Sequence, residues 1–452
     1  MELSQPDSKP LKTKPFEVTH LMVVALALPM TLAYLTTPLL GLVDTAVVGR
    51  MGSAALIGGL AVGAIIIDVV FTTFNFLRSG TTGLTAQAVG REDEKEKQAT
   101  LFRALIIAVI TGMMMVALMP KILWLGLYFI APGENVADAT SRYFSIRMLG
   151  APFALANYAI LGWLIGLGRS GLALLLQVVL NGTNIILSIL LGLTFGYGIE
   201  GVAVATIIGE VIATLLGGLI CWRLLDTNYR PSRQRVFDRP ALWKFANLNA
   251  DIMMRSFILL FAFAYFTAQS SRFGETTLAA NAVLLNFFLI AGYFLDGLAT
   301  AAEQIVGRAI GARYKPAFWK AIRLTLLWNF IISGALALVF LIFGNQLIHL
   351  ITTLEPVQIE AKSYLIFAAL TAVTGVLAFQ MDGVFIGATW SREMSMMMVI
   401  SLVVYLLAWQ ILEPYGNTGL WLCLHIFLIA RGITLSFRLP VKARREFDET
   451  GV

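Results

Sequence analysis

The stretch Ala104-Leu-Ile-Ile-Ala-Val-Ile-Thr-Gly-Met-Met-Met-Val-Ala117 decides the fold class, because it is almost continuously apolar. A second run, Leu172–Leu180, has the same character. Transmembrane β-strands instead alternate apolar and polar residues over about ten positions, so these runs predict α-helices. A helix that crosses a bilayer needs about 20 predominantly apolar residues, and the sequence around both runs supplies them.

The rest of the chain has the composition of an integral membrane protein. Hydrophobic residues make up 58% of the 452 positions and charged residues 13%, against about 25% charged residues in soluble proteins. We therefore predict an all-α membrane protein with twelve transmembrane helices, several of them long enough to be tilted, kinked or extended into water. The predicted spans are 20–49, 53–78, 99–124, 140–166, 171–194, 200–222, 244–270, 276–306, 318–349, 358–387, 394–412 and 417–438.

Basic residues predict the orientation, since cytoplasmic connections carry an excess of Lys and Arg. They gather at the termini and after the second, sixth, eighth and tenth spans, so both termini should be cytoplasmic and the number of spans even. The net charge of +6 then reflects topology and does not suggest nucleic acid. These residues are Lys9, Lys12, Lys14, Arg91, Lys95, Lys97, Arg223, Arg230, Arg233, Arg235, Arg239, Lys244, Arg308, Arg313, Lys315, Lys320, Arg392, Lys442, Arg444 and Arg445.

Other features exclude some classes of protein. The first twenty residues are polar and the first apolar segment is too long for a cleaved signal peptide, so none is expected. Cys221 and Cys423 lie in or beside apolar segments, which indicates neither a disulfide framework nor a metal cluster. Three scattered histidines, His20, His349 and His425, are expected to be structural.

An internal repeat divides the chain into two halves. Arg272 begins the pattern R-x-G-x-x-x-L 222 positions after Arg50 begins it, and Gly383 begins G-x-x-I-G 221 positions after Gly162. Gly90 and Gly311, each before a charged connection, also differ by 221 positions. Six spans per half give both halves the same orientation, and such parallel repeats place a cleft between two lobes that alternate its access.

The repeat sets the expected domain organisation. A duplicated scaffold without transport activity is the alternative to a carrier. The predicted segments are a cytoplasmic N-terminal segment 1–19, an N-lobe 20–222, a basic cytoplasmic linker 223–243, a C-lobe 244–440 and a cytoplasmic tail 441–452.

The motif Pro38-Leu-Leu-Gly-Leu-Val-Asp44-Thr-Ala-Val-Val-Gly49-Arg50 resembles the first-helix signature of MATE (multidrug and toxic compound extrusion) transporters. Further motifs resemble the DinF branch of that family: Asn249-Ala-Asp251-Ile-Met-Met-Arg255, Leu278-Ala-Ala-Asn-Ala-Val283, Leu295-Asp296-Gly297 and Asp382-Gly-Val-Phe-Ile-Gly-Ala-Thr389. The resemblance covers about residues 17–440. It implies two six-helix lobes arranged in a V with a central cleft, and export of organic or amphipathic compounds such as drugs in exchange for protons or sodium.

Charged side chains inside a bilayer are costly, so each is a functional candidate. Asp44 is the foremost, because a partly buried carboxylate downstream of Pro29 and Pro38 can bind and release a proton. The resemblance implies that Asp44 is the N-lobe coupling residue and that Pro29 is the hinge of this helix. Ser188 stands where the family usually has a second aspartate, which puts a two-carboxylate mechanism in doubt. The expected polar shell around Asp44, which could equally be interhelical packing, is Asn157, Asn184, Ser188 and Thr206.

The predicted C-lobe carries a different set of charges: Asp251, Arg255, Asp296, Glu303 and Asp382. The four acids are candidate ion-coupling residues, and Arg255 is a candidate cavity-lining residue. Asp251 and Arg255 are four positions apart and are expected to pair on one helical face. The resemblance implies a possible Na⁺ site near Asp382 and otherwise no metal. A structural ion-pair network is the alternative.

The predicted function is secondary active efflux by alternating access. We expect small organic substrates, the lipid bilayer as surroundings, no nucleic acid, no cofactor beyond H⁺ or Na⁺ as coupling ion, a monomer, and residence in the bacterial inner membrane. Alternatives are a flippase for lipid-linked precursors, a membrane-embedded enzyme and a channel. The absence of H-E-x-x-H, G-x-S-x-G and P-loop motifs argues against an enzyme and against ATP hydrolysis as the energy source.

Overall fold

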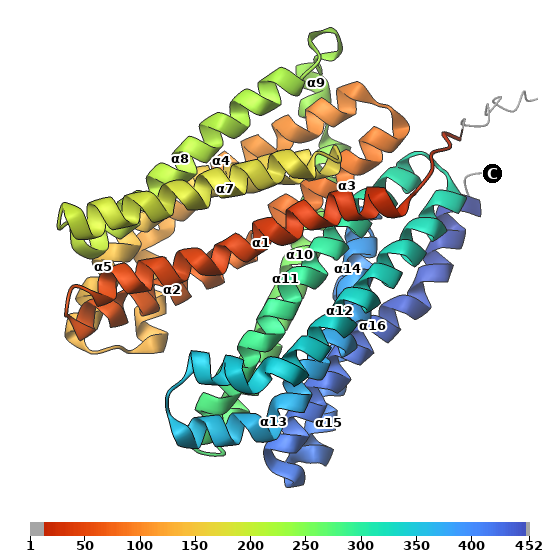
Figure 1. Cartoon of the computed structure of the whole chain (residues 1–452). Coiled ribbons are helices and arrows are strands. Elements are labelled where there is room, and N and C mark those ends of the chain that lie inside the picture. The colour runs from red at the N-terminus through yellow and green to blue at the C-terminus, as the bar shows by residue number, and fades with distance from the viewer. Residues whose placement is uncertain (1–12, 449–452) are drawn as a thin grey trace, which may run out of the picture.

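The computed structural model describes residues 13–448, and this part of the chain is helical throughout, without a strand (Figure 1). The predicted N-terminal segment and tail therefore lie partly outside the described residues, as do Lys9 and Lys12. The first bundle, which we call the N-lobe, contains α1 (His20–Gly49), α2 (Ala54–Thr73), α3 (Phe76–Arg91), α4 (Glu94–Ile130), α5 (Glu134–Met148), α6 (Ala151–Gly166), α7 (Ser170–Leu187), η1 (Ser188–Thr194) and α8 (Gly198–Leu224).

The second bundle, the C-lobe, follows a short connection. The connection contains η2 (Thr227–Tyr229) and α9 (Arg233–Val236). The C-lobe contains α10 (Arg239–Ser271), α11 (Glu275–Gly311), α12 (Lys315–Ile351), α13 (Glu355–Thr374), α14 (Val376–Gly387), α15 (Ser391–Leu412), η3 (Glu413–Tyr415) and α16 (Gly416–Asp448). Helix α16 thus runs on through the first residues of the predicted tail.

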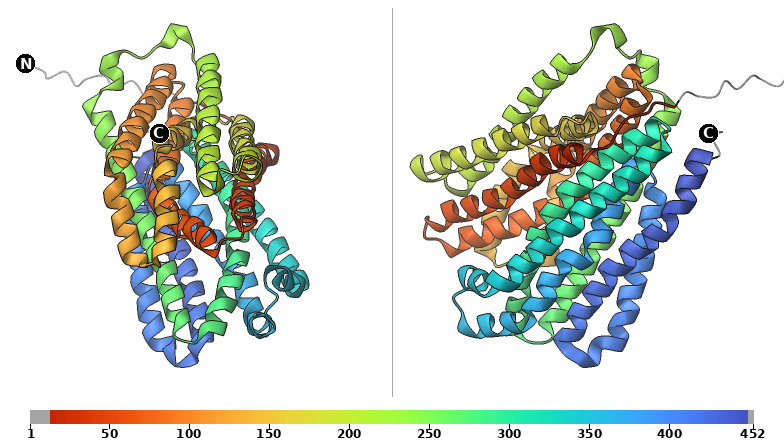
Figure 2. Two further views of the ribbon diagram at one scale, coloured as in Figure 1. Left: turned by 90° about the vertical axis from the view of Figure 1, so that its left-hand side faces the viewer. Right: turned by 45° about the vertical axis from the view of Figure 1, so that its right-hand side comes forward.

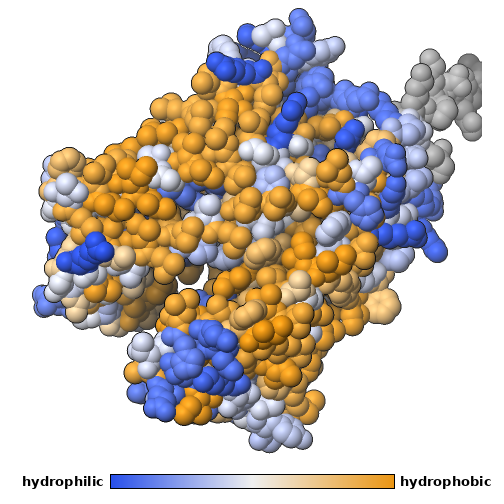
Figure 3. Space-filling model, viewed as in Figure 1, coloured by the Kyte–Doolittle hydropathy of each residue, from blue (hydrophilic) through white to orange (hydrophobic). Residues whose placement is uncertain are grey.

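The helices have the length and hydropathy of membrane spans. In the described part, 10 helical segments could cross a membrane, and counting one bent pair as a span gives 11. One of the ten, Ser391–Asp448, contains two separate helices, α15 and α16, which pack along each other. With the bent pair counted as a span and α15 and α16 counted separately, the total is the twelve expected spans. On the face that Figure 3 shows, apolar side chains cover much of both lobes, and polar ones gather toward their ends.

Several spans differ in detail from the predicted ranges. The second span does not end at residue 78, because α3 continues it to Arg91. The span predicted as 140–166 begins at Glu134 and is bent by 52° between α5 and α6. Pro152 lies at the start of α6, where a residue without an amide hydrogen fits the first turn of a new helix but would break a continuous one.

The two lobes form a V. They meet at the end where α1 begins and α16 ends, which we call the terminus end, and they diverge toward the opposite end (Figures 1 and 2). The expected fold class, with two lobes, a V shape and a central cleft, is confirmed. Figure 3 shows the notch between the lobes on the side away from the termini.

Helices α3 and α11 cross at the terminus end with almost no side chain between them. A Cβ atom at Gly90 would lie 2.1 Å from the carbonyl oxygen of Arg308, and one at Gly311 would lie 2.0 Å from that of Gln87. The two glycines are the repeat-related pair, and each faces the residue three positions before the other. The crossing is therefore symmetric, and only glycine permits it in this state.

The segment before α1 adds further contacts across the same junction. The backbone amide of Lys14 donates to the carbonyl of Ala312 at 3.1 Å, and its Nζ donates to the carbonyl of Arg91 at 2.8 Å. The guanidinium of Arg308 lies 4.3 Å from the ring centroid of Phe16. Residues of both lobes are thus tied together at the terminus end.

Candidate functional site

Asp44 lies in the second half of α1, and the residue is 8% exposed. The hydroxyl of Ser188 lies 2.8 Å from Asp44 Oδ1 and 3.0 Å from Asn184 Oδ1. Ser188 begins a seven-residue π-helical segment, Ser188–Thr194, and such wide turns occur often at functional sites. A short polar chain, Asp44–Ser188–Asn184, therefore runs from α1 into α7.

The other two members of the expected polar shell form different bonds. The amide nitrogen of Asn157 donates to the backbone carbonyl of Glu210 at 3.0 Å, and the hydroxyl of Thr206 donates to that of Val202 at 3.1 Å. Both therefore bond the backbone of α8, whereas Asn184 and Ser188 gather at Asp44.

Sequence reasoning missed a buried ion pair in the N-lobe, between Arg147 and Glu210. The guanidinium of Arg147 on α5 makes two hydrogen bonds, of 3.1 and 2.6 Å, to the carboxylate of Glu210 on α8. Both side chains are largely buried, and Arg147 interacts electrostatically with Asp44. Their presence inside the apolar spans 140–166 and 200–222 was the signal that could have revealed them.

The C-lobe places Asp382 of α14 between two arginines. Arg255 of α10 and Arg431 of α16 both donate to its carboxylate. Arg431, which is 2% exposed, was also missed, although it lies inside the span 417–438. The charge of Asp382 is thus compensated by two guanidinium groups in this state. No group of three or more His, Cys, Asp or Glu suited to a metal occurs in the described part of the chain.

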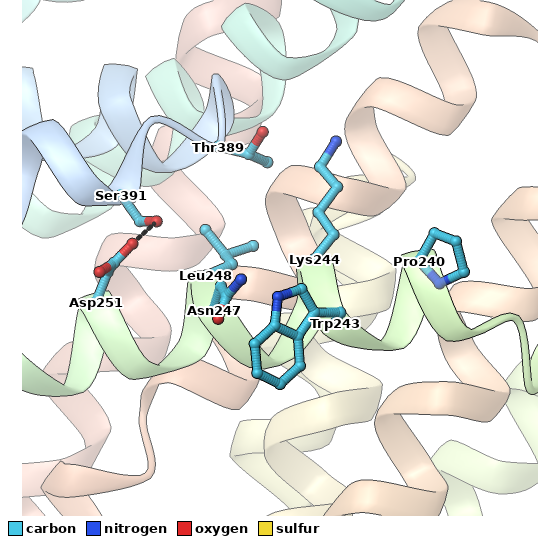
Figure 4. Close-up of a pocket in the computed structure, with 8 residues that line it drawn as sticks. All are labelled: Pro240, Trp243, Lys244, Asn247, Leu248, Asp251, Thr389 and Ser391. Carbon is cyan, nitrogen blue, oxygen red and sulfur yellow. Dashed lines mark hydrogen bonds between the residues drawn. The ribbon is translucent and has the colours of Figure 1, made fainter.

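The expected pairing of Asp251 with Arg255 is wrong. Asp251 accepts a hydrogen bond of 2.7 Å from the hydroxyl of Ser391, at the start of α15 (Figure 4), and Arg255 is bound to Asp382. The spacing of four residues allowed a contact along α10, but partners on neighbouring helices are available to both side chains. Asp251 lines a pocket of about 430 Å³ near the start of α10, with Trp243, Lys244 and Thr389 among its other residues.

The two remaining acids lie on α11. Asp296 is exposed and interacts electrostatically with Arg78 of the N-lobe and with Arg255 and Arg431 of its own lobe. Glu303 is 2% exposed, and its Oε2 lies 3.9 Å from Nη1 of Arg78 on α3. Both acids therefore interact with Arg78, and Glu303 is the one whose carboxylate lies within 4 Å of it.

Comparisons with known proteins distinguish a carrier from other membrane proteins. The sequence model of the MatE family matches residues 29–190 and 252–409, more than half of the chain. The chain belongs to the MATE family of efflux transporters. It is 37% identical over 422 residues to DNA damage-inducible protein F of Escherichia coli (strain K12), covering 91% of this chain and 90% of that protein. The DinF branch expected from the motifs is thereby confirmed.

The MATE relationship extends over the whole fold. The chain is 24% identical over 428 residues to the probable multidrug resistance protein NorM of Bacillus anthracis, covering 90% of this chain and 89% of that protein. A solved structure described as MATE in the bent conformation matches with a TM-score of 0.87 at 20% identity, covering 95% of this chain and 97% of that one. The protein is thus a multi-pass membrane protein of a transporter family and not of an enzyme family.

Proposed function

We propose that this MATE transporter is an antiporter that exports organic compounds in exchange for protons, with Asp44 as the N-lobe proton site. The observation that carries the proposal is the chain Asp44–Ser188–Asn184, all three members of which are at most 8% exposed. A buried carboxylate bonded to neutral partners can change its protonation state without breaking an ion pair.

The chain can adjust to either protonation state of Asp44. A hydroxyl has a single hydrogen to donate, so Ser188 cannot donate to both neighbours at once. When Asp44 is ionised, Ser188 donates to it. When Asp44 is protonated, it donates to Ser188, which then donates to Asn184 Oδ1.

The amide of Asn184 completes this adjustment. Its Nδ2 has no hydrogen-bond partner within the described residues. Half a turn of the amide exchanges its oxygen and nitrogen, so that Asn184 donates to Ser188 while Ser188 donates to ionised Asp44. The whole chain can therefore reverse its direction with one proton, which favours H⁺ over Na⁺ as the coupling ion.

We further propose that the terminus end faces the cytoplasm of a bacterial inner membrane and that the protein works as a monomer. Basic side chains at this end, including Lys14, Arg91 and Arg308, support the orientation. With the lobes in contact there, the structure corresponds to a state open to the outside. A proton taken up at Asp44 from that side would be released once the lobes rock to open the terminus end.

Everted membrane vesicles that are acidified by respiration test the proposal. Adding a transported dye should dissipate the proton gradient in vesicles with the wild-type protein. The variant Asp44→Asn keeps the shape of the side chain but cannot release a proton, so it should abolish the response at equal protein levels. The pair Arg142→Gln/Glu200→Gln, an exposed ion pair of the N-lobe, is the control and should respond like the wild type.

Two results would contradict the proposal. Gradient-driven efflux by Asp44→Asn at the wild-type rate would remove Asp44 from the coupling. Efflux that requires an imposed sodium gradient and does not respond to the proton gradient would show that the coupling ion is Na⁺ and not H⁺.

A further inference from the structure

Arg78 reaches from the N-lobe toward the C-lobe where the two meet. It lies in the first turn of α3, where its Nε donates to Asn75 Oδ1 at 3.2 Å and its Nη2 donates to Ser79 Oγ at 3.1 Å. Its Nη1 has no hydrogen-bond partner within the described residues and is directed at Glu303, 3.9 Å from Oε2. The N-lobe thus holds a cation in front of a C-lobe carboxylate without forming a tight ion pair.

Arg78 is the cation that lies closest to Glu303 among the described ion pairs. The C-lobe arginines, Arg255 and Arg431, are bound by Asp382, and exposed Asp296 provides the second negative charge near them. Arg255 also interacts electrostatically with Glu303, but both C-lobe arginines are bound by Asp382, so Arg78 is the cation within 4 Å of Glu303 in the described part of the chain. It is 2% exposed, and its Oε1 has no hydrogen-bond partner in the described part of the chain.

An aromatic ring completes the surroundings of Arg78. The guanidinium carbon of Arg78 lies 5.8 Å from the ring centroid of Tyr34 on α1. The Tyr34 hydroxyl lies 3.0 Å from Thr300 Oγ1, and Thr300 is one turn before Glu303 on α11. Proteins bind organic cations between an aromatic ring and a carboxylate. In this structure the guanidinium group of Arg78 takes the place of such a cation.

The arrangement changes when the lobes part at the terminus end. Helix α3 packs on α11 and α14 through close backbone contacts, and a Cβ atom at Gly83 would lie 2.5 Å from the carbonyl oxygen of Ile386. Rocking the lobes apart at this end moves α3, and Arg78 with it, away from α11. Glu303 then loses its closest counter-ion, while Arg255, which also interacts with it, stays bound to Asp382. A poorly compensated buried charge is unfavourable inside a membrane.

We propose that Glu303 forms the anionic part of a binding site for an organic cation when the terminus end is open, and that Arg78 is a tethered cation that expels the ligand when this end closes. The proposal deepens the proposed antiport and rests on it for the direction of transport. A cationic compound from the terminus side pairs with Glu303 in place of Arg78. Closure returns Arg78 to Glu303, so the compound is displaced toward the opposite side.

Equilibrium binding of tetraphenylphosphonium to the full-length protein in lipid nanodiscs tests the site. Arg78→Gln removes the competing cation and should tighten binding by about tenfold or more. Arg78→Lys retains a cation and should bind like the wild type. Adding Glu303→Gln to Arg78→Gln should abolish the gain. Tetraphenylborate, an anion of the same shape, should show no gain in any variant, and Arg142→Gln serves as a control far from the site.

The proposal is overturned if Arg78→Gln leaves the affinity for tetraphenylphosphonium unchanged, or if the gain persists when Glu303→Gln is added. Should Arg78→Gln alone not fold, Glu303→Gln in the wild-type background decides instead. It should raise the KM for tetraphenylphosphonium efflux several-fold, and an unchanged KM would contradict the site. The binding measurements use no ion gradient, so they stand independently of whether Asp44→Asn abolishes proton coupling.

Discussion

Two buried aspartates, one in each lobe, show how differently the halves of this repeat have been used. Asp44 accepts one hydrogen bond from a neutral hydroxyl, and Asp382 is held by two guanidinium groups. A carboxylate between two arginines is held in ion pairs, whereas one beside a serine can exchange a proton without breaking an ion pair. Compensation of charge, and not burial alone, separates the surroundings of these two acids.

The largest expected effect concerns the stability of the two sites. Asp382→Asn leaves Arg255 and Arg431 without a counter-ion and should lower the free energy of unfolding by about 3–5 kcal/mol. Asp44→Asn changes one hydrogen bond and should alter it by about 1 kcal/mol or less. Thermal unfolding of the purified variants in detergent measures both. Equal losses would show that the two aspartates do not differ as described.

A smaller effect is expected at the crossing of α3 and α11, where the lobes are alike. Gly90→Ala and Gly311→Ala each place a methyl group about 2 Å from a partner carbonyl, so both should shift the protein toward opening at the terminus end. Spin labels at Lys95→Cys and Pro316→Cys, on either side of the crossing, report the distance. Both native cysteines are buried and should label poorly.

The control for this experiment is Gly334→Ala on α12, where an added methyl group meets no atom within 4 Å. It makes the same gain in helix propensity without touching the junction. If Gly90→Ala and Gly311→Ala give the same label distances as Gly334→Ala, the crossing does not control closure. If only one of the two variants, Gly90→Ala or Gly311→Ala, opens the terminus end, the two glycines do not contribute equally to closure.

The fold could be predicted from the sequence because membrane helices can be identified by the length and hydropathy of their apolar segments. The in-register glycines also predicted the two lobes, and Gly90 with Gly311 then proved to meet at their junction. Asp44 could be singled out as a candidate because a charge in an apolar helix is conspicuous. Each of these signals depends either on residues close together in the sequence or on a constant spacing between the two halves, so the tertiary structure is not needed to recognise it.

The charge partners could not be predicted, because they join helices far apart in the chain. Arg431 and Asp382 are 49 positions apart, and Arg147 and Glu210 are 63. Helices that are apolar on all sides give no hydrophobic stripe from which to infer which face meets which neighbour. The spacing of Asp251 and Arg255 was a local signal, and it misled because both side chains found partners across the bundle.

The central claim is that Asp44 exchanges a proton as substrate binds and leaves. The most direct measurement is the proton release that follows addition of a transported dye to the purified protein in weakly buffered solution. The wild-type protein should release protons, and Asp44→Asn should release far fewer while still binding the dye. Equal release by the two proteins would contradict the account.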